Sequence, residues 1–265
     1  NIRKKIELAV DNELISDVPV CTILSGGIDS VIITYLLSKK VKNLEAFVVS
    51  NGINEKKKDD LYYARKAAEF MKIPLNEIII DEEYVMNNLR DAIYAVEDFK
   101  WVQVSPAVAQ LPMSKAIHEK GYKVVFGGEG SDEIFGSYGH IFAFKWKDDD
   151  YHKARIDLID KLHEKNLVRT NKAMMYGGTV ELRTPFLDKD FVEYGLGIPP
   201  QYKKIDNHWK PLLREAFQGE IPDDILWRPK KTFQVGCHTD FLEDHKELMS
   251  DYFNDLFDKQ NKTFW

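Results

Sequence analysis

The chain has 265 residues, 44% of them hydrophobic, which is enough for one large α/β domain or for a domain with a helical annex. Acidic residues outnumber basic ones by 43 to 37, and the resulting net charge of -6 has the wrong sign for bulk nucleic-acid binding. No apolar run approaches the roughly 18 residues of a membrane span. The composition therefore favours a soluble protein that acts on small molecules, with no nucleic-acid or membrane partner.

The two cysteines, Cys21 and Cys237, lie far apart and belong to no C-x-x-C or Cys/His metal pattern. Thiols of this kind suit a reducing cytoplasm, which is the location we expect. The sequence begins at Asn1 rather than at a methionine, so it leaves open whether residues precede Asn1.

Helix-like and strand-like segments alternate along the first half of the chain. Residues 2–14 carry an apolar side chain at every fourth position, which predicts a helix with one buried stripe. Short, mostly apolar runs predict strands. The predicted order is helix 2–14, strand 18–24, helix 31–40, strand 44–50, helix 61–71, strand 78–80, helices 82–97 and 106–120, and strand 122–126.

This alternation predicts an α/β fold, a parallel twisted sheet with helices on both faces, in which ligands bind beyond the carboxyl ends of the strands. Residues 51–60 are rich in lysine and aspartate and predict a solvated loop. From residue 151 onward the pattern is mainly helical, and we expect these helices to pack over one edge of the sheet. Residues 241–265 are interpreted as a terminal helix and tail.

The segment Ser25-Gly-Gly-Ile-Asp-Ser30 lies between the first predicted strand and the second predicted helix. Its glycines allow close approach to a ligand, and Ser25 and Ser30 add hydroxyls beside free helix amides, where an anion such as phosphate is favoured. It matches neither G-x-x-x-x-G-K-S/T nor G-x-G-x-x-G. Asp29 would repel phosphate unless a cation lay between them, which indicates Mg²⁺. The alternative is an ordinary strand-to-helix turn with Asp29 as the N-cap.

A second informative segment, Gly127-Gly-Glu-Gly-Ser-Asp-Glu133, follows the strand at 122–126. It holds three glycines and three carboxylates in seven residues. A turn needs the glycines, but crowded carboxylates repel one another unless a cation or a substrate amine is present. The segment therefore predicts a metal or substrate site.

Together the two segments carry a resemblance to a known family. Ser25 to Ser30 resembles the pyrophosphate-binding loop of the ATP pyrophosphatases, which split ATP into AMP and pyrophosphate while adenylating a substrate. Residues 128–138 are similar to the G-E-G-S-D-E-x-F-G-G-Y signature of the asparagine synthetase domain of the glutamine-hydrolysing type. Three shorter stretches also agree with this domain: Asn171 to Met174, Val180 to Asp188 and Arg228 to Lys230.

The resemblance extends over about residues 2–236 and implies an adenine nucleotide alpha hydrolase-like fold. It implies an ATP-dependent ligase that adenylates a carboxylate, releases pyrophosphate and transfers ammonia, giving asparagine and AMP when the carboxylate is that of aspartate. The residues implied for ATP and pyrophosphate are Ser25, Gly26, Gly27, Asp29, Ser30 and Lys230. Hard oxygen ligands suit Mg²⁺, so Asp29 and Asp132 are predicted to share this ion, in agreement with the resemblance.

Other roles follow from the resemblance alone. Main-chain contacts to adenosine are implied for Leu24, Val49 and Gly128. Lys230 is implied as the residue that reaches the α- and β-phosphates, with Lys231 beside it as an ordinary solvated lysine. Glu129 is implied to orient the incoming ammonia or to take its proton. Glu97, Glu181 and Asp188 are candidates for contacts to the substrate, with ordinary salt bridges as the alternative.

We expect one domain over 1–265, with a nucleotide-binding core at 1–140 and a mainly helical part at 141–265 that contributes Lys230. The chain also departs from the family pattern. Residues 101–114 match it poorly, so aspartate as the substrate rests on the resemblance. Smaller departures are Val31 in place of a second serine or threonine, Gly127 in place of serine, and Ser137 in place of glycine.

Synthetases of this type carry an N-terminal glutaminase domain with a nucleophilic cysteine, and this sequence has none. We therefore expect free ammonia, a separate glutaminase, or an amine on another substrate. Three functions stay open: an ammonia-dependent asparagine synthetase, another amide- or lactam-forming ligase on the same scaffold, and a non-catalytic nucleotide-binding module. The joint presence of Asp29, Asp132, Glu129 and Lys230 favours an enzyme.

Overall fold

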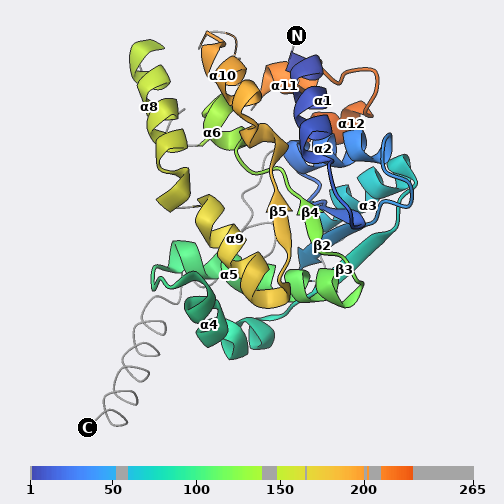
Figure 1. Ribbon diagram of the computed structural model, residues 1–265, viewed down its shortest axis with the longest axis vertical. Coiled ribbons are helices and arrows are strands. Elements are labelled where there is room, and N and C mark those ends of the chain that lie inside the picture. Colours follow the sequence, from blue (N-terminus) through green and yellow to red (C-terminus); the bar gives the residue numbers. More distant parts are fainter. Residues whose placement is uncertain are drawn as a thin grey trace.

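The computed structural model describes residues 2–51, 59–138, 148–164, 166–199, 202 and 210–228. In this part of the chain a five-stranded sheet lies between helices (Figure 1). The strands are β1 (Val20–Ile23), β2 (Ala46–Ser50), β3 (Leu75–Ile79), β4 (Val124–Phe126) and β5 (Glu181–Arg183). The helices are α1 (Ile2–Glu13), α2 (Ile28–Ser38), α3 (Asp60–Met71), α4 (Glu82–Val96), α5 (Trp101–Glu119), α6 (Ser131–Phe135), α8 (Asp148–Asp160), α9 (Asn166–Gly178), α10 (Lys189–Gly197), α11 (Pro211–Glu215) and α12 (Asp223–Leu226), with 3-10 turns at Leu162–Glu164 and Pro185–Leu187.

The sheet has the strand order β3-β2-β1-β4-β5, and every pairing is parallel. The chain builds outward from β1 through β2 to β3 and then crosses to the other side of β1 to form β4 and β5. The carboxyl ends of β1 and β4 therefore meet at the point where the strand order reverses, which is where open parallel sheets bind ligands.

Successive strand residues point to opposite faces of the sheet, and each face is covered by its own set of helices. Val20 and Phe126 belong to a core that includes residues of α1, α2 and α3, whereas Cys21, Phe47 and Val125 belong to a core with α4, α5 and α9. The predicted parallel sheet with helices on both faces is confirmed. No helix in the described residues is long and apolar enough to cross a membrane.

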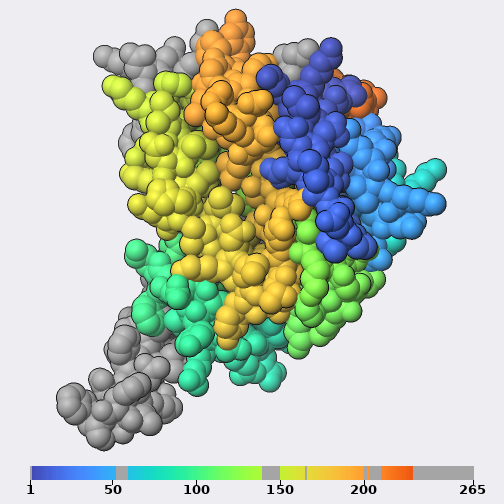
Figure 2. Space-filling model, in the orientation of Figure 1, coloured from blue at the N-terminus to red at the C-terminus, as the bar shows by residue number. Residues whose placement is uncertain are grey.

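The second half of the chain contributes more than the predicted helices. β5 pairs with β4 through Val124 opposite Glu181 and Phe126 opposite Arg183, which extends the sheet by one strand. Its three residues are exposed or half-buried, so they lack the apolar run that identifies an inner strand. α10 packs against α1, and Figure 2 shows these orange and blue segments side by side.

α5 begins at Trp101, five residues before the predicted start at Pro106, so both Pro106 and Pro112 lie inside the helix. Proline has no N–H to donate to the carbonyl four residues earlier. The carbonyl of Val102, which Pro106 leaves without its helical donor, accepts from Arg169 Nη1 at 3.4 Å. A residue of α9 thus replaces the missing helical donor.

Candidate active site

The Ser25–Ser30 segment forms a tight turn between β1 and α2. Gly26 has φ +72°, and a Cβ there would lie 2.7 Å from the Ala64 nitrogen and 2.8 Å from the Asp60 carbonyl, so the turn packs directly on the first turns of α3. The hydroxyl oxygens of Ser25 and Ser30 lie 3.0 Å apart. The Gly27 N–H donates to Ser25 Oγ at 3.3 Å. Two hydroxyls and a helix N-terminus thus converge at the carboxyl end of the central strand.

α2 begins at Ile28, three residues before the predicted start, so Asp29 lies in the first helical turn. Gly27 is the N-cap, and the alternative in which Asp29 caps the helix is wrong. Asp29 instead points to the neighbouring loop, where its Oδ1 accepts a 2.7 Å hydrogen bond from Ser131 Oγ.

The Gly127–Glu133 segment joins β4 to α6 and packs against the start of α2. A Cβ on Gly128 would lie 2.8 Å from the Ser30 nitrogen and 2.9 Å from Asp29 Cβ. Gly130 has φ +89°, a conformation that glycine adopts readily, and it is followed by the first turn of α6 with Asp132. Glycines thus allow the acidic segment to lie directly on the Ser25–Ser30 turn.

Asp29 and Asp132 converge on one cation, the ammonium group of Lys210. Lys210 Nζ lies 2.5 Å from Asp29 Oδ2 and 2.7 Å from Asp132 Oδ1, and the side chain is 1% exposed. Burial alone would lower the pKa of Lys210, but the two carboxylates outweigh it and hold this pKa above its ordinary value. Three segments far apart in the chain are therefore joined by one buried ammonium group and two partly exposed carboxylates, which we call the Asp–Lys–Asp cluster.

The two aspartates suit Mg²⁺ as well as an ammonium ion, because their oxygens already meet around one positive charge and carboxylates are the ligands that Mg²⁺ prefers. The described residues contain no group of three or more His, Cys, Asp or Glu side chains able to hold a metal. Mg²⁺ is commonly held by one or two carboxylates together with substrate phosphates and water. The donor set therefore fits a metal that arrives with a phosphorylated substrate.

Two buried arginines from the second half of the chain, Arg214 and Arg228, lie near the Ser25–Ser30 turn. Arg228 Nη2 donates to Asp60 Oδ1 at 2.5 Å, and its guanidinium lies 4.8 Å from the centre of the Tyr63 ring. Burial lowers the pKa of Arg214, and the charge of Asp29 opposes this shift. Arg228 fixes the chain two residues before Lys230, which itself lies outside the described residues.

Glu129 is half-buried, but its Oε2 is shielded from solvent and has no hydrogen-bond partner. Burial raises the pKa of this carboxyl, and the nearby charges of Glu133 and Asp29 add to the shift, whereas Arg169 opposes it. Arg169 also keeps a buried Nε without a partner. A carboxyl in this environment holds a proton more readily than an exposed one.

The predicted adenosine-contact residues also gather at this edge of the sheet. Leu24 directly follows β1, Val49 is the penultimate residue of β2, and Gly128 lies two residues beyond β4. These three strands are neighbours in the sheet, and the Leu24 N–H donates to the Phe47 carbonyl at 2.9 Å. Their contacts to a nucleotide stay a prediction.

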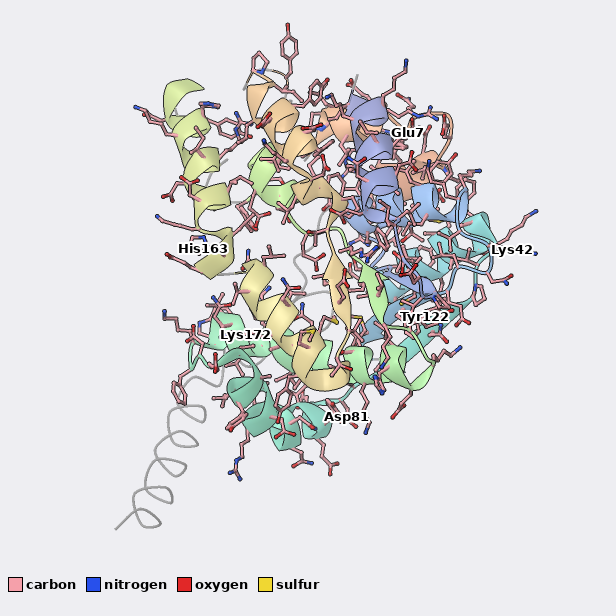
Figure 3. All side chains as sticks on the ribbon, viewed as in Figure 1. Glu7, Lys42, Asp81, Tyr122, His163 and Lys172 are labelled. Atoms are coloured by element: carbon pink, nitrogen blue, oxygen red, sulfur yellow. The ribbon has the colours of Figure 1, made fainter. Side chains whose placement is uncertain are left out.

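The three predicted substrate carboxylates lie on separate elements and make ordinary structural contacts. Glu97 is exposed and pairs with Lys172 of α9. Figure 3 labels Lys172, which lies beside α4 and α5. Glu181 is exposed and lies 2.7 Å from Arg183 Nε. Asp188 caps α10 by accepting from the Phe191 N–H at 3.1 Å. These contacts need no substrate to account for them.

Sequence reasoning missed Lys210 and Asp60. Lys210 directly precedes Pro211 at the start of α11, and nothing in this local pattern distinguishes a buried lysine from a solvated one. Asp60 was included in a charged, solvated loop, yet it is buried against Arg228. No signal in the neighbouring residues identifies the distant partner of either side chain.

Fold and site define a parallel α/β protein that brings a Ser/Gly turn, an acidic loop and a buried lysine to its ligand-binding edge. The chain belongs to the asparagine synthase family, because the model of the family described as "Asparagine synthase" matches residues 1–156 and 143–264.

Curated relatives include a probable glutamine-hydrolyzing asparagine synthetase of Schizosaccharomyces pombe, 33% identical over 93% of this chain and 49% of that protein. Glutamine-hydrolyzing asparagine synthetase B of Escherichia coli is 32% identical over 96% of this chain and 48% of that protein. The chain thus spans about half the length of these relatives. Among solved structures, the U34-tRNA thiolase NcsA of Methanococcus maripaludis overlaps with a TM-score of 0.46 at 17% identity, over 93% of this chain and 72% of that one.

Replacing Lys210 by methionine tests the Asp–Lys–Asp cluster. Without the ammonium group, Asp29 and Asp132 face each other with no charge between them, so we expect the free energy of unfolding to fall by about 3 kcal/mol without divalent metal. We also expect Mg²⁺ to raise the melting temperature of this variant more than that of the wild type. Lys172→Met, which removes the partner of an exposed carboxylate, is the matched control and should change stability little. Equal stabilities of the two variants would contradict the assignment.

The half-buried carboxyl of Glu13, near the edge strand β5, makes the free energy of unfolding depend on pH. Burial and the charge of Asp188 raise its pKa to about 7, although Arg183 opposes the shift. Its stabilising contribution is full below about pH 4.5 and is lost as the pH rises through about 7, because the folded protein then holds a half-buried carboxylate. Glu13→Gln should therefore be more stable than the wild type at pH 8, by about 1 kcal/mol. Denaturant unfolding at pH 5 and pH 8 measures this, and Glu69→Gln, an exposed site, should show no such difference.

Proposed function

We propose that this chain is the synthetase part of an ATP-dependent amide-forming ligase. It adenylates a carboxylate with release of pyrophosphate and then transfers ammonia to the acyl group. The observation that supports this best is the convergence of Asp29 and Asp132 on one cation beside the Ser25–Ser30 turn. The names of the relatives make the side chain of aspartate the first carboxylate to test.

In this proposal the Ser25–Ser30 turn holds the β- and γ-phosphates through its hydroxyls and main-chain amides, with Gly26 and Gly27 allowing close approach. Asp29 and Asp132 would hold Mg²⁺, which would supply positive charge near the departing pyrophosphate. Lys210 keeps the two carboxylates neutralised in the nucleotide-free protein. With Mg²⁺ held by these carboxylates, the ammonium group of Lys210 would be available to the phosphates.

The remaining roles divide between the two halves of the chain. The main chain at Leu24, Val49 and Gly128 holds the adenosine. Lys230 stabilises charge at the α- and β-phosphates, and the buried Arg228–Asp60 pair anchors its segment. The main catalytic contribution is to hold the carboxylate oxygen in line with the α-phosphorus. The substrates then lose their translational and rotational entropy on binding and not in the chemical step.

Glu129 acts on the amine in the second step. Ammonia attacks the acyl carbon, the bond to AMP breaks, and the nitrogen must lose a proton to become an amide. A half-buried carboxyl with a raised pKa can accept that proton. Glu97, Glu181 and Asp188 stay candidates for substrate contacts, but their present partners favour structural roles.

The ammonia source is a separate part of the proposal. The relatives are named as glutamine-hydrolyzing enzymes and are about twice as long as the segment matched here. We infer that the chain uses free ammonia or ammonia from a glutaminase, either attached or separate. A cytoplasmic setting is also proposed, in keeping with the free, buried thiol of Cys21.

The test is pyrophosphate release from ATP and Mg²⁺ in the presence of aspartate and ammonium, with product analysis. Aspartate labelled with ¹⁸O in its carboxylates should transfer one label to AMP, because adenylation forms a new bond between this oxygen and the α-phosphorus. Omission of ammonium should leave ATP–pyrophosphate exchange but no asparagine. Unlabelled AMP would exclude the adenylate. ATP binding without turnover of aspartate would point to a different carboxylate, as in another amide- or lactam-forming ligase, or to a non-catalytic nucleotide-binding module.

Lys230→Ala is expected to abolish adenylation while ATP binding is retained, because its charge is needed at the transition state and other groups hold the nucleotide. ATP–pyrophosphate exchange measures the first effect, and nucleotide titration measures the second. Lys231→Ala is the matched control and should keep at least half of the exchange rate. Full exchange in Lys230→Ala would refute the role given to Lys230.

A further inference from the structure

The short helix α6 carries Asp132 to the site, and its other end is held by α8. α6 has only five residues, Ser131–Phe135, and a helix of this length depends on its surroundings for its position. Its first turn is tied to α2, because Ser131 Oγ donates to Asp29 Oδ1 at 2.7 Å. The location of Asp132 therefore also depends on what holds the carboxyl end of α6.

The last four carbonyl groups of a helix have no partner within the helix, and all four of those in α6 are satisfied. The first two accept main-chain N–H groups from the turn that follows α6. The other two accept from α8: Arg155 Nη1 donates to the Ile134 carbonyl at 3.0 Å. The Tyr151 hydroxyl donates to the Phe135 carbonyl at 2.6 Å. Two side chains of α8 thus complete the capping of α6.

Arg155 is 0% exposed and caps a second helix as well. Its Nη2 donates to the Leu196 carbonyl, near the end of α10, at 3.3 Å, and lies 2.8 Å from His152 Nδ1. Its guanidinium lies 5.3 Å from the centre of the Tyr151 ring. The carboxyl end of a helix carries partial negative charge, so the ends of α6 and α10 offset the cost of burying this cation. Figure 1 shows α6, α8 and α10 next to one another.

We propose that Arg155 is a positioning residue that fixes Asp132 opposite Asp29, and that Tyr151 supports it in this role. Arg155 acts on the site through α6. It joins α6 to α10, which in turn packs against α1, so Asp132 is tied to helices that cover one face of the sheet. The catalytic consequence of this placement rests on the function proposed above, whereas the placement of Asp132 beside Lys210 does not.

Releasing the carboxyl end of α6 would loosen the site in a defined way. Asp132 lies two residues before Ile134, about 3 Å along the helix axis, so a shift at Ile134 reaches it directly. Asp29 and Asp132 are then less often spaced for one cation. We expect the effect in adenylation, in which the carboxylate oxygen bonds to the α-phosphorus and pyrophosphate leaves with the electron pair of the broken P–O bond. The leaving group needs positive charge nearby.

The Mg²⁺ dependence of ATP–pyrophosphate exchange tests the proposal on the full chain. In Arg155→Met we expect the Mg²⁺ concentration for half-maximal exchange to rise about tenfold, as is common when groups that orient metal ligands are removed. Lys153→Met is the matched control, since Lys153 is exposed on the same helix, and it should leave this concentration unchanged. A lower rate at every Mg²⁺ concentration with an unchanged midpoint would overturn the proposal, because Arg155 would then only stabilise the fold.

Tyr151→Phe is a milder variant that decides the matter if Arg155→Met does not fold. It removes only the hydroxyl that donates to the Phe135 carbonyl and keeps the ring that fills the same space. We expect the Mg²⁺ midpoint to rise about threefold, less than for Arg155→Met, because a single hydrogen bond is lost. With Arg155→Met unfolded, an unchanged midpoint in Tyr151→Phe would reject the positioning role.

A stability cycle provides a readout that needs no activity. Lys210→Met should lower the melting temperature of the wild type, and this loss should shrink to about half or less in an Arg155→Met or Tyr151→Phe background, where Asp132 is no longer held against Lys210. The Lys153→Met background should show the full loss. Equal losses in every background would contradict the placement of Asp132 by α8. If the wild type shows no adenylation with any carboxylate, the proposed function fails, and this cycle still decides the positioning role.

Discussion

The site depends on one buried ammonium group placed between two carboxylates. Lys210 has lost its water, which is costly, and only the joint presence of Asp29 and Asp132 offsets that cost. These residues come from α2, from the turn that begins α6, and from the start of α11. Folding of the second half of the chain is thereby coupled to the geometry of the ligand-binding edge. The same arrangement keeps two carboxylates close together in the absence of a nucleotide and a metal.

Close approach of main chains is the second requirement of this geometry. Gly26 lets the Ser25–Ser30 turn rest on α3, and Gly128 lets the acidic loop rest on α2. Side chains at either position would collide with main-chain atoms and move the carboxylates apart. Gly127 differs from both, since a side chain there would meet the end of Glu129 rather than main chain. Glycines in both loops thus let the two segments lie close to each other and to the neighbouring helices.

Two independent observations support the same proposed function: membership of the asparagine synthase family and the architecture of the site. Family membership comes from the match along the sequence, whereas the Asp–Lys–Asp cluster comes from the packing of distant segments. Both halves of the chain are needed for the proposed chemistry, because the first supplies the phosphate turn and the carboxylates and the second supplies the described cations Lys210, Arg214 and Arg228.

The sequence alone determined the parallel α/β architecture and the two loops at its ligand-binding edge, because hydrophobic periodicity and glycine placement are local signals. It misplaced the starts of α2 and α5 by a few residues and missed β5, whose short, exposed edge carries no apolar run. Only the tertiary structure decided which charges are buried. Lys210 and Asp60 look like surface residues in the sequence, and the exposed Glu97 and Glu181 resemble Asp29 in kind. A charge is buried only where packing brings it a partner from a distant segment, and that partner cannot be read from neighbouring residues.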